Sequence, residues 1–242
     1  MKIIVPMAGR GSRFADRGYQ TPKPLIEVAG KPMVLWAIKS LEKFDYSEII
    51  FVVLLEHQER YDVVSLITQA IGDKAKFVFL EDVTQGQLCT VLAAEAYLNS
   101  SEDVLIAASD TYIKSEMASH IADKVSDCKG LISVANLAGS QWSFARTDEK
   151  GKVVEVAEKV RISDHASTGL YYFSDGSQLV SLAKEMIANQ ETTRGEYYVI
   201  PVYQKIIAQG GLVGISQADE MWDMGTPEAK AQFEAYLQTN IL

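Results

Sequence analysis

Continuous apolar runs alternate with segments of helical periodicity along the first half of the chain. Residues 2–6 (KIIVP) and 49–55 (IIFVVLL) are such runs, and they are typical of parallel strands covered on both faces of a sheet. Residues 32–44 begin with a proline and place apolar side chains at helical spacing, so we predict a helix there. This alternation predicts an α/β fold with a doubly wound, mostly parallel, Rossmann-like sheet. It continues with a helix at 58–71, a strand at 76–80, a helix at 87–98 and a strand at 104–108.

The pattern changes after about residue 130. Segments of strand character then follow one another closely, and Asp148 to Gly151 is predicted to form a hairpin turn between two of them. We interpret this part as an inserted antiparallel region that forms the second wall of a pocket beside a nucleotide-binding first half. The strands are expected at 130–136, 143–147, 153–158, 168–173 and 212–215, and the helices at 176–189, 197–209 and 227–238.

The composition narrows the class of protein. With 48% hydrophobic and 23% charged residues, the chain is expected to be a soluble globular protein. A net charge of -9 argues against a nucleic-acid partner, because such proteins need a concentrated basic face. Apolar runs stay shorter than the roughly 18 residues of a membrane span, so we expect no membrane partner and a cytoplasmic location. Cys89 and Cys128 have neither disulfide nor zinc spacing.

A glycine-rich loop follows the first strand. Residues 6–14 (PMAGRGSRF) precede residues 21–25 (TPKPL). The loop is not a dinucleotide fingerprint, because Phe14 stands where the third glycine belongs, and it lacks the Walker A spacing. What remains is a loop whose backbone N–H groups can bind an anion, with Arg13 and Lys23 adding positive charge. The loop is therefore predicted to bind phosphate.

Two aspartates are candidate metal ligands. Asp110 follows the strand at 104–108, at the carboxyl end where open α/β sheets hold their ligands. Asp223 lies in a predicted turn flanked by Trp222 and Gly225. Two carboxylates that converge on phosphate oxygens suit Mg²⁺. On position alone, however, an aspartate after a strand is more often a turn former or a helix cap.

These motifs together resemble those of a known family. Residues 9–13 (GRGSR) with residues 22–25 (PKPL) resemble the G-x-G-[ST]-R and PKP[LM] motif of the nucleotidylyltransferases that join a nucleoside triphosphate to a sugar 1-phosphate and release pyrophosphate. Residues 107–110 and the D-x-GTPE-like residues 222–228 match in order, so the resemblance spans nearly the whole chain. It implies a GT-A-like nucleotidyltransferase fold in one domain over 1–242, with a nucleotide-binding half at about 1–115 and an acceptor-binding half at about 116–242. The antiparallel insert of this fold would bind the sugar.

The resemblance also implies roles for single residues. Arg13 and Lys23 would be catalytic, and Asp110 and Asp223 would bind Mg²⁺. A nucleoside triphosphate and a sugar 1-phosphate would be the partners, in the synthesis of surface polysaccharide or another glycan precursor, and a homo-oligomer is expected. Nucleotide-binding positions would be Ala8, Gly9, Gly11, Ser12, Arg13, Lys23 and Gly86. Acceptor-binding positions would be Glu158, Lys159, Thr168, Gly169, Tyr171 and Arg194.

Some features depart from the family pattern or leave alternatives open. Pro6 and Met7 replace small residues, and Ser143 stands where a glycine beside the sugar is common, so the sugar stays undetermined, as does the base. A glycosyltransferase would carry a D-x-D motif, which Asp110-Thr111-Tyr112 lacks. A cytidylyltransferase for a non-sugar phosphate such as phosphocholine is the nearest alternative. A sensing subunit without turnover is an alternative of another class.

Overall fold

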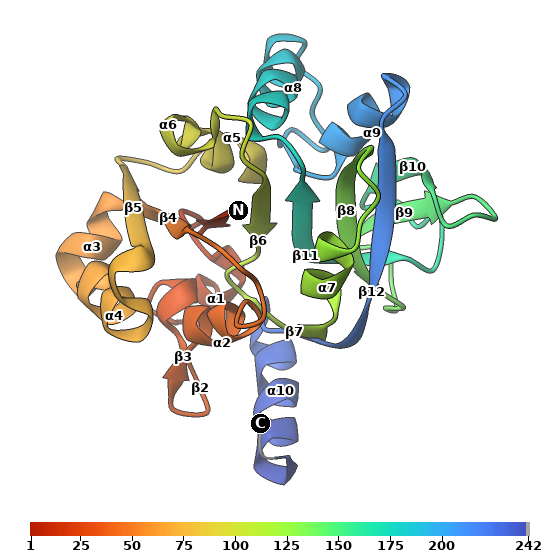
Figure 1. Ribbon diagram of the computed structural model, residues 1–242. Coiled ribbons are helices and arrows are strands. Elements are labelled where there is room, and N and C mark those ends of the chain that lie inside the picture. Colours follow the sequence, from red (N-terminus) through yellow and green to blue (C-terminus); the bar gives the residue numbers. More distant parts are fainter. Residues whose placement is uncertain (241–242) are drawn as a thin grey trace.

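A ten-stranded mixed sheet forms the centre of the protein, in the order β5-β4-β1-β6-β11-β8-β12-β7 (Figure 1). The computed structural model describes residues 1–240. The strands of this row are β1 (Lys2–Pro6), β4 (Glu48–Leu54), β5 (Ala75–Leu80), β6 (Val104–Ala107), β7 (Thr111–Ser115), β8 (Cys128–Ala135), β11 (Ala166–Phe173) and β12 (Leu212–Asp223). The hairpin of β9 (Ser143–Thr147) and β10 (Val153–Glu158) attaches to β11, while β2 (Glu27–Val28) and β3 (Lys31–Pro32) pair separately.

The strand directions confirm the predicted α/β class. β1 pairs in parallel with β4 and with β6, and β4 pairs in parallel with β5. The chain therefore winds outward from β1 to one side and returns to its other side at β6, as a doubly wound sheet does. β11 then runs antiparallel between β6 and β8, and the β9 and β10 hairpin beside it is the predicted antiparallel insert. Together these strands form one continuous sheet.

Helices cover both faces of this sheet (Figure 1). Among residues 1–240, no helix is long and apolar enough to span a lipid bilayer. The α-helices are α1 (Ser12–Ala15), α2 (Met33–Lys39), α3 (Leu55–Tyr61), α4 (Val63–Ile71), α5 (Gln87–Leu92), α6 (Glu95–Leu98), α7 (Met117–Ala122), α8 (Gly176–Ala188), α9 (Pro201–Ala208) and α10 (Pro227–Thr239). Short 3₁₀ turns occur at η1 (Lys23–Leu25) and η2 (Gly72–Lys74).

Several predicted helices are shorter or broken. The helix predicted over 58–71 is wrong as one element, because Asp62 adopts a left-handed conformation (φ 47°) between α3 and α4. The helix predicted over 87–98 is likewise two helices, separated near Ala94. The helix predicted over 32–44 ends at Lys39, and Pro32 caps its start. Apolar spacing continues across the break near Ala94 and beyond Lys39 because one buried face runs through each of these two regions.

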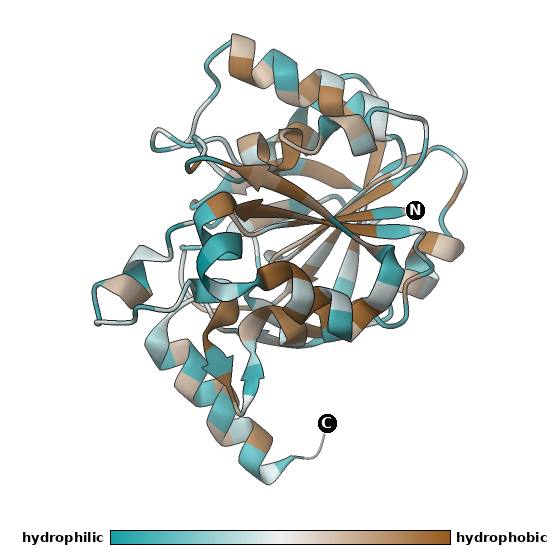
Figure 2. Ribbon diagram, turned by 90° about the vertical axis from the view of Figure 1, so that its left-hand side faces the viewer, coloured by the Kyte–Doolittle hydropathy of each residue, from teal (hydrophilic) through white to brown (hydrophobic). Residues whose placement is uncertain are grey.

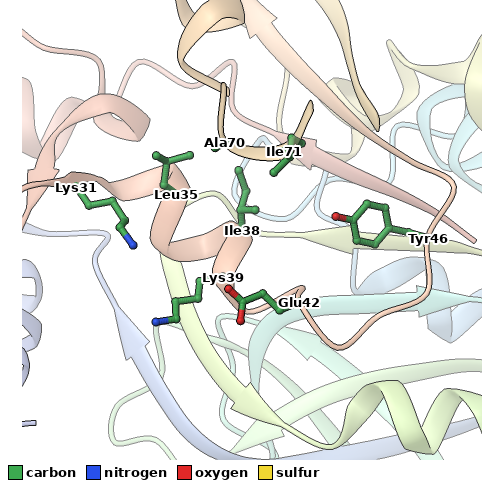
Figure 3. A pocket seen from close by; sticks show the side chains of 8 residues that line it. All are labelled: Lys31, Leu35, Ile38, Lys39, Glu42, Tyr46, Ala70 and Ile71. Atoms are coloured by element: carbon green, nitrogen blue, oxygen red, sulfur yellow. The ribbon is translucent and has the colours of Figure 1, made fainter. Parts of the chain in front are cut away.

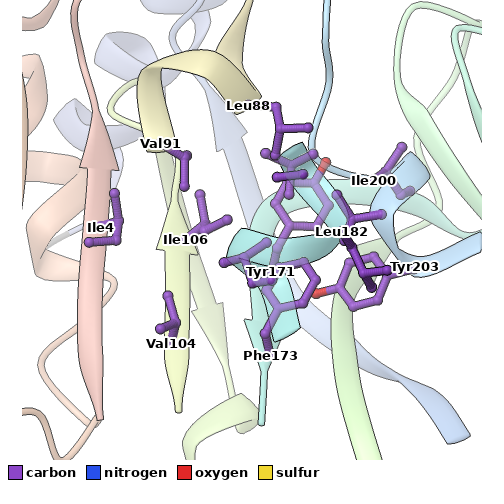
Figure 4. Close-up of a cluster of buried hydrophobic side chains, with 14 of the residues drawn as sticks. Ile4, Leu88, Val91, Val104, Ile106, Tyr171, Phe173, Leu182, Ile200 and Tyr203 are labelled. Atoms are coloured by element: carbon purple, nitrogen blue, oxygen red, sulfur yellow. The ribbon is translucent and has the colours of Figure 1, made fainter. Parts of the chain in front are cut away.

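Side chains alternate between the two faces of the central strands. On β1, Ile4 joins one buried cluster while Ile3 and Val5 join the other. This explains the unbroken apolar runs, since a sheet covered on both faces leaves no position for a polar side chain. Figure 4 shows the first cluster, in which Ile106 of β6 and Tyr171 of β11 gather with residues of α5 and α8 such as Val91 and Leu182. Figure 2 shows the hydrophobic strands at the centre and more hydrophilic residues on the outer helices.

A third, aromatic cluster attaches α10 to the sheet. The Phe233 ring is fully buried, and its centroid lies 5.3 Å from that of Trp36, 5.5 Å from Tyr112 and 5.6 Å from Trp222. Tyr112 belongs to β7 and Trp222 to β12. The cluster therefore holds α10 against the ends of the two strands that carry the second half of the candidate site.

The largest error of the sequence prediction concerns β7 and β12. A short strand was expected over 212–215, but β12 extends to Asp223, and β7 and α7 were not predicted. The second part of β12 pairs with β7 at the edge of the sheet, where its side chains are mixed polar and apolar and only partly buried. Because no apolar run marks an edge strand of this kind, hydropathy did not reveal it.

Phe233→Ala is expected to lower the free energy of unfolding by about 3–5 kcal/mol, because it removes a fully buried ring and leaves a cavity. Chemical denaturation measures the change. Phe79→Ala is the control, because Phe79 is exposed on β5, and it should cost about 1 kcal/mol or less. Equal effects of the two substitutions would show that the aromatic cluster does not anchor α10.

Candidate active site

The two parts of the glycine and lysine motif contact each other directly. Gly11 caps the start of α1 in the left-handed conformation (φ 61°). A Cβ atom on this residue would lie 2.7 Å from Cβ of Lys23. Glycine is therefore required at this position for both backbone shape and packing. The contact places η1, which begins at Lys23, against the loop that follows β1.

The loops after β1 and β6 lie at the point where the winding of the sheet reverses. The chain leaves β1 toward β4 but enters β6 on the opposite side of β1, so the loops that leave these neighbouring strands diverge and open a crevice. The glycine loop follows β1, and Asp110 follows β6, as predicted. Pro6 faces this crevice, whereas the Met7 side chain is buried in the core on the opposite face.

Strand pairing brings Asp223 to Asp110. β12 runs antiparallel to β7, with Asp223 opposite Thr111, and the backbone N–H of Met224 donates to the Asp110 carbonyl oxygen at 2.8 Å. A Cβ atom on Gly225 would lie 2.8 Å from Asp223 Oδ1 and 3.2 Å from Asp110 Oδ2. Both carboxylates thus flank one small space. The predicted turn at Asp223 is wrong, since this residue ends a strand.

The two carboxyl groups have opposite pKa shifts. Burial opposes ionisation of Asp110, but the charge of Lys23 and a hydrogen bond from its ammonium outweigh that cost and lower the Asp110 pKa. Burial and the nearby Asp110 carboxylate raise the pKa of Asp223, although the Gly225 N–H and two cations oppose the shift. Paired carboxylates with diverging pKa values are characteristic of functional sites.

Two cavities lie at the ends of β1 and β6, and the two carboxylates line one of them. One, which we call the glycine-loop cavity, has a volume of about 420 Å³ and lies between the loop after β1 and the start of α5. The other, which we call the carboxylate cavity, has a volume of about 840 Å³ and extends from Asp110 and Asp223 to the β9 and β10 hairpin. Gln87 and Glu196 line both cavities. Two ligands bound in them would therefore be neighbours.

A hydrogen-bonded chain lies at the far end of the carboxylate cavity. Glu158 is only 8% exposed, so it is not the surface charge that a Glu-Lys dipeptide on a strand usually is. It accepts a hydrogen bond from the Ser143 hydroxyl, to which the Tyr171 hydroxyl donates at 3.3 Å. Burial raises the pKa of Glu158, with further repulsion from Glu196, and burial raises that of Tyr171 to about 12. Tyr171 is therefore a protonated donor at neutral pH.

Lys159 is held by residues that were not predicted. Its backbone is left-handed (φ 56°), and its ammonium lies 4.3 Å from the Tyr198 ring centroid and donates to the Tyr198 hydroxyl. That hydroxyl donates to Glu196 Oε2 at 2.6 Å. Glu196 and Tyr198 closely follow the predicted acceptor-binding residue Arg194 in the sequence, and this proximity was the only signal for them.

The structure brings most of the predicted site residues to one of the two cavities. Ala8, Gly9 and Gly86 line the glycine-loop cavity. Arg13, Asp110, Glu158, Lys159, Thr168, Gly169, Tyr171 and Asp223 line the carboxylate cavity. Gly11, Ser12, Lys23 and Arg194 line neither, although Lys23 bonds to Asp110 and the charge of Arg194 acts on Glu158. Their roles stay predictions.

Further residues that line the cavities were not predicted individually. They are Arg10, Thr84, Gln85 and Gln87 beside the glycine loop, and Gln141, Trp142 and Trp222 in the carboxylate cavity. Arg10 forms an ion pair with Asp82 at 2.9 Å, which connects the glycine loop to the loop before α5. Long-range pairing of this kind leaves no local pattern in the sequence.

A separate cavity of about 590 Å³ lies between α2 and the end of α4 (Figure 3). Figure 3 shows Leu35 and Ile38 of α2 on the side of Ile71, with Lys31 and Lys39 at another part of the rim. It contains none of the predicted site residues. The chemistry-bearing side chains are therefore concentrated in the two cavities at the switch point.

The donor set fits a hard divalent cation. Among residues 1–240, no group of three or more His, Cys, Asp or Glu side chains is arranged to hold a metal ion by itself. Mg²⁺ typically takes one or two protein carboxylates and completes its octahedron with water and substrate phosphates. Asp110 and Asp223 provide these two, and the space above Gly225 between them is free of any Cβ atom.

Comparisons with known proteins agree with this arrangement. The family model described as nucleotidyl transferase matches residues 2–240. The chain is 26% identical over 228 residues to the bifunctional protein GlmU of Caldanaerobacter subterraneus, an alignment that covers 90% of this chain and 47% of the relative. It is 23% identical over 232 residues to glucose-1-phosphate thymidylyltransferase of Streptomyces antibioticus, with 92% and 62% covered. The chain thus spans about half to three fifths of the length of these relatives.

A solved structure shares the whole fold. The nucleoside-diphosphate-sugar pyrophosphorylase of Vibrio cholerae RC9 is 27% identical, with a TM-score of 0.83 over 96% of this chain and 99% of that one. Because both chains are covered almost completely, the similarity includes the β9 and β10 hairpin as well as the parallel half of the sheet.

Glu158→Gln is expected to raise the melting temperature of the ligand-free protein at pH 7, because burial disfavours the Glu158 carboxylate. The folded-state pKa lies above the ordinary value of 4.5, so the stability of the parent protein falls as the pH rises through the interval between these two values. Below about pH 4, Glu158 is protonated in both the folded and the unfolded state, so the stability advantage of the variant should disappear.

Differential scanning fluorimetry between pH 4 and pH 8 measures this change. Glu155→Gln on the same strand is the matched control, since Glu155 is partly exposed and paired with Arg146. A gain that is equal at all pH values would contradict the electrostatic explanation.

Proposed function

This chain belongs to the nucleotidyl transferase family, and we propose that it transfers a nucleotidyl group from a nucleoside triphosphate to a sugar 1-phosphate and releases pyrophosphate. The match over residues 2–240 confirms the family resemblance drawn from the glycine and lysine motif. The nucleotide sugar formed would serve as a glycan precursor, and Mg²⁺ is the proposed metal.

One observation supports this reaction above others. Asp110 and Asp223 flank a common space that Lys23 and Arg13 adjoin, and both carboxylates line the carboxylate cavity, which shares Gln87 with the glycine-loop cavity. Two anionic substrates must be held in line while negative charge accumulates on the transferred phosphoryl group. The glycine-loop cavity is proposed for the nucleoside and the carboxylate cavity for the acceptor, so that the phosphates meet at the carboxylates.

The reaction needs no protein nucleophile or general base. The second pKa of a phosphate monoester is about 6, so the sugar phosphate is already largely a dianion at neutral pH. Its oxygen attacks the α-phosphorus, the bond to the bridging oxygen breaks, and pyrophosphate leaves. The protein has to position these groups and neutralise their charge.

The proposed cations act on opposite sides of the transferred group. Lys23 and Arg13 would bind triphosphate oxygens, while Lys159 and Arg194 would bind the acceptor phosphate. A divalent cation held by Asp110 and Asp223 would neutralise phosphate charge and orient the α-phosphate. The chain therefore contributes two pairs of cations of its own.

The acceptor hydroxyls would meet the polar end of the carboxylate cavity. The buried Glu158 carboxylate accepts a hydrogen bond from the Ser143 hydroxyl, which in turn accepts one from the Tyr171 hydroxyl. The Thr168 hydroxyl donates to Ser133 at 2.7 Å, so its oxygen can still accept a bond from a sugar hydroxyl. A sugar presents both donors and acceptors, and this set of groups satisfies both.

One observation favours a non-sugar acceptor as the second candidate. The Tyr198 ring already holds the Lys159 ammonium at 4.3 Å, and Trp142 and Trp222 line the same cavity. Aromatic walls next to carboxylates bind quaternary ammonium groups. A cytidylyltransferase acting on phosphocholine would use that feature.

Pyrophosphate release decides between these functions. The purified protein is incubated with Mg²⁺, each of the four nucleoside triphosphates, and either a pool of sugar 1-phosphates or phosphocholine. We expect release with one triphosphate and the sugar pool, and Asp110→Asn should abolish it, whereas Asp219→Asn, exposed on the same strand as Asp223, should not. Release only with CTP and phosphocholine would establish the second candidate. Nucleotide binding without release from any pair would indicate a sensing subunit.

Lys23→Ala is expected to lower kcat roughly a hundredfold, because one preorganised donor to a transition-state charge is worth on the order of 2.7 to 4 kcal/mol. Circular dichroism should show a folded protein. Lys184→Ala is the control, since Lys184 forms an ion pair with Glu95 on the surface, far from both cavities. A near-normal kcat in Lys23→Ala would remove Lys23 from the mechanism.

A further inference from the structure

Lys23 occupies an unexpected position for a residue that is proposed to bind triphosphate. Its ammonium donates to Asp110 Oδ2, and the two side chains are 22% and 24% exposed. Both groups are thus partly withdrawn from water, where an ion pair is stronger than at an open surface. In the ligand-free protein, the lysine proposed for phosphate is bound to the carboxylate proposed for metal.

The oxygen that Lys23 engages is also the oxygen that faces Asp223. Asp110 Oδ2 would lie 3.2 Å from a Cβ atom on Gly225, which in turn would lie 2.8 Å from Asp223 Oδ1. Asp110 Oδ1 is directed instead toward the Thr111 hydroxyl, at 3.4 Å. An ammonium on Oδ2 therefore competes with any cation placed between the two carboxylates.

The backbone of Lys23 is fixed, but its side chain is long. Pro22 and Pro24 restrict the chain on both sides, and Gly11 packs against Lys23 Cβ. Only the flexible four-carbon stem can redirect the ammonium, and Arg13 of the neighbouring helix α1 provides a second positive charge for an incoming phosphate.

We propose that Lys23 is a placeholder cation that couples triphosphate binding to metal binding, an inference that rests on the two sites of the proposed function. Without ligands, its ammonium neutralises Asp110. A triphosphate draws the ammonium to its own oxygens and so frees Oδ2 for the divalent cation. Each ligand therefore strengthens the binding of the other, and by linkage the effect is reciprocal.

Metal binding without any nucleotide tests the first half of this inference. Mn²⁺ is titrated into the parent protein, Lys23→Met and Arg13→Met, and free Mn²⁺ is followed by electron paramagnetic resonance. Arg13→Met is the matched control, because it also removes a nearby positive charge. The charge of Arg13 acts on Asp223, but Arg13 makes no hydrogen bond to Asp110. Lys23→Met should bind Mn²⁺ at least about fivefold more tightly than Arg13→Met, the lower end of usual coupling factors.

Anion binding without metal tests the second half. Inorganic tripolyphosphate is titrated by calorimetry in the presence of EDTA into the parent protein, Asp110→Asn and Asp223→Asn. Both variants lose one negative charge of the same site, but only Asp110→Asn releases Lys23. It should bind tripolyphosphate at least about fivefold more tightly than Asp223→Asn.

The outcomes separate this inference from the proposed function. Equal Mn²⁺ affinities of Lys23→Met and Arg13→Met, or equal tripolyphosphate affinities of the two aspartate variants, would overturn the coupling and leave the metal site intact. Absence of Mn²⁺ binding to Lys23→Met would overturn both the coupling and the assignment of a metal to Asp110 and Asp223. Melting curves of all variants verify that each protein is folded.

Discussion

The antiparallel pairing of β12 with β7 is the constraint on which the candidate site depends. It places Asp223 opposite Thr111, directly beside Asp110, and the hydrogen bond from the Met224 N–H to the Asp110 carbonyl closes the arrangement. Two like charges do not approach each other unless the backbone forces them to and nearby cations offset the repulsion. The aromatic cluster around Phe233 holds the strands in register, so packing far from the cavities positions the carboxylates within them.

Electrostatics explains how such a site persists in an acidic protein. The net charge is -9, yet Lys23, Arg13 and Lys159 lie beside the carboxylates of the candidate site. The ion pair of Lys23 with Asp110 offsets one of these carboxylate charges. Burying the Glu158 carboxylate costs stability, as its raised pKa indicates, and residues with shifted pKa values cluster at functional sites.

Much of the fold follows from local pattern. Apart from Lys2 and Glu48 at their first positions, β1, β4 and β6 are apolar because helices cover both faces of the sheet, and the alternation of these strands with helices predicted the parallel half correctly. Edge strands lack this signal, so β7 and the end of β12 were missed. The break at Asp62 was missed as well, because a single non-glycine residue in the left-handed conformation leaves no mark in the hydropathy pattern.

The sequence by itself determined which residue types the candidate site contains. The glycine loop, Lys23 between two prolines, and Asp110 after its strand are local features whose residue types predict an anion-binding loop and a metal ligand. Only the tertiary structure decided which groups touch: Gly11 against Lys23, Asp223 beside Asp110, and Lys159 over the ring of Tyr198. The physical reason is that composition and spacing report on the neighbours of a residue along the chain, whereas these contacts join segments that only the sheet brings together.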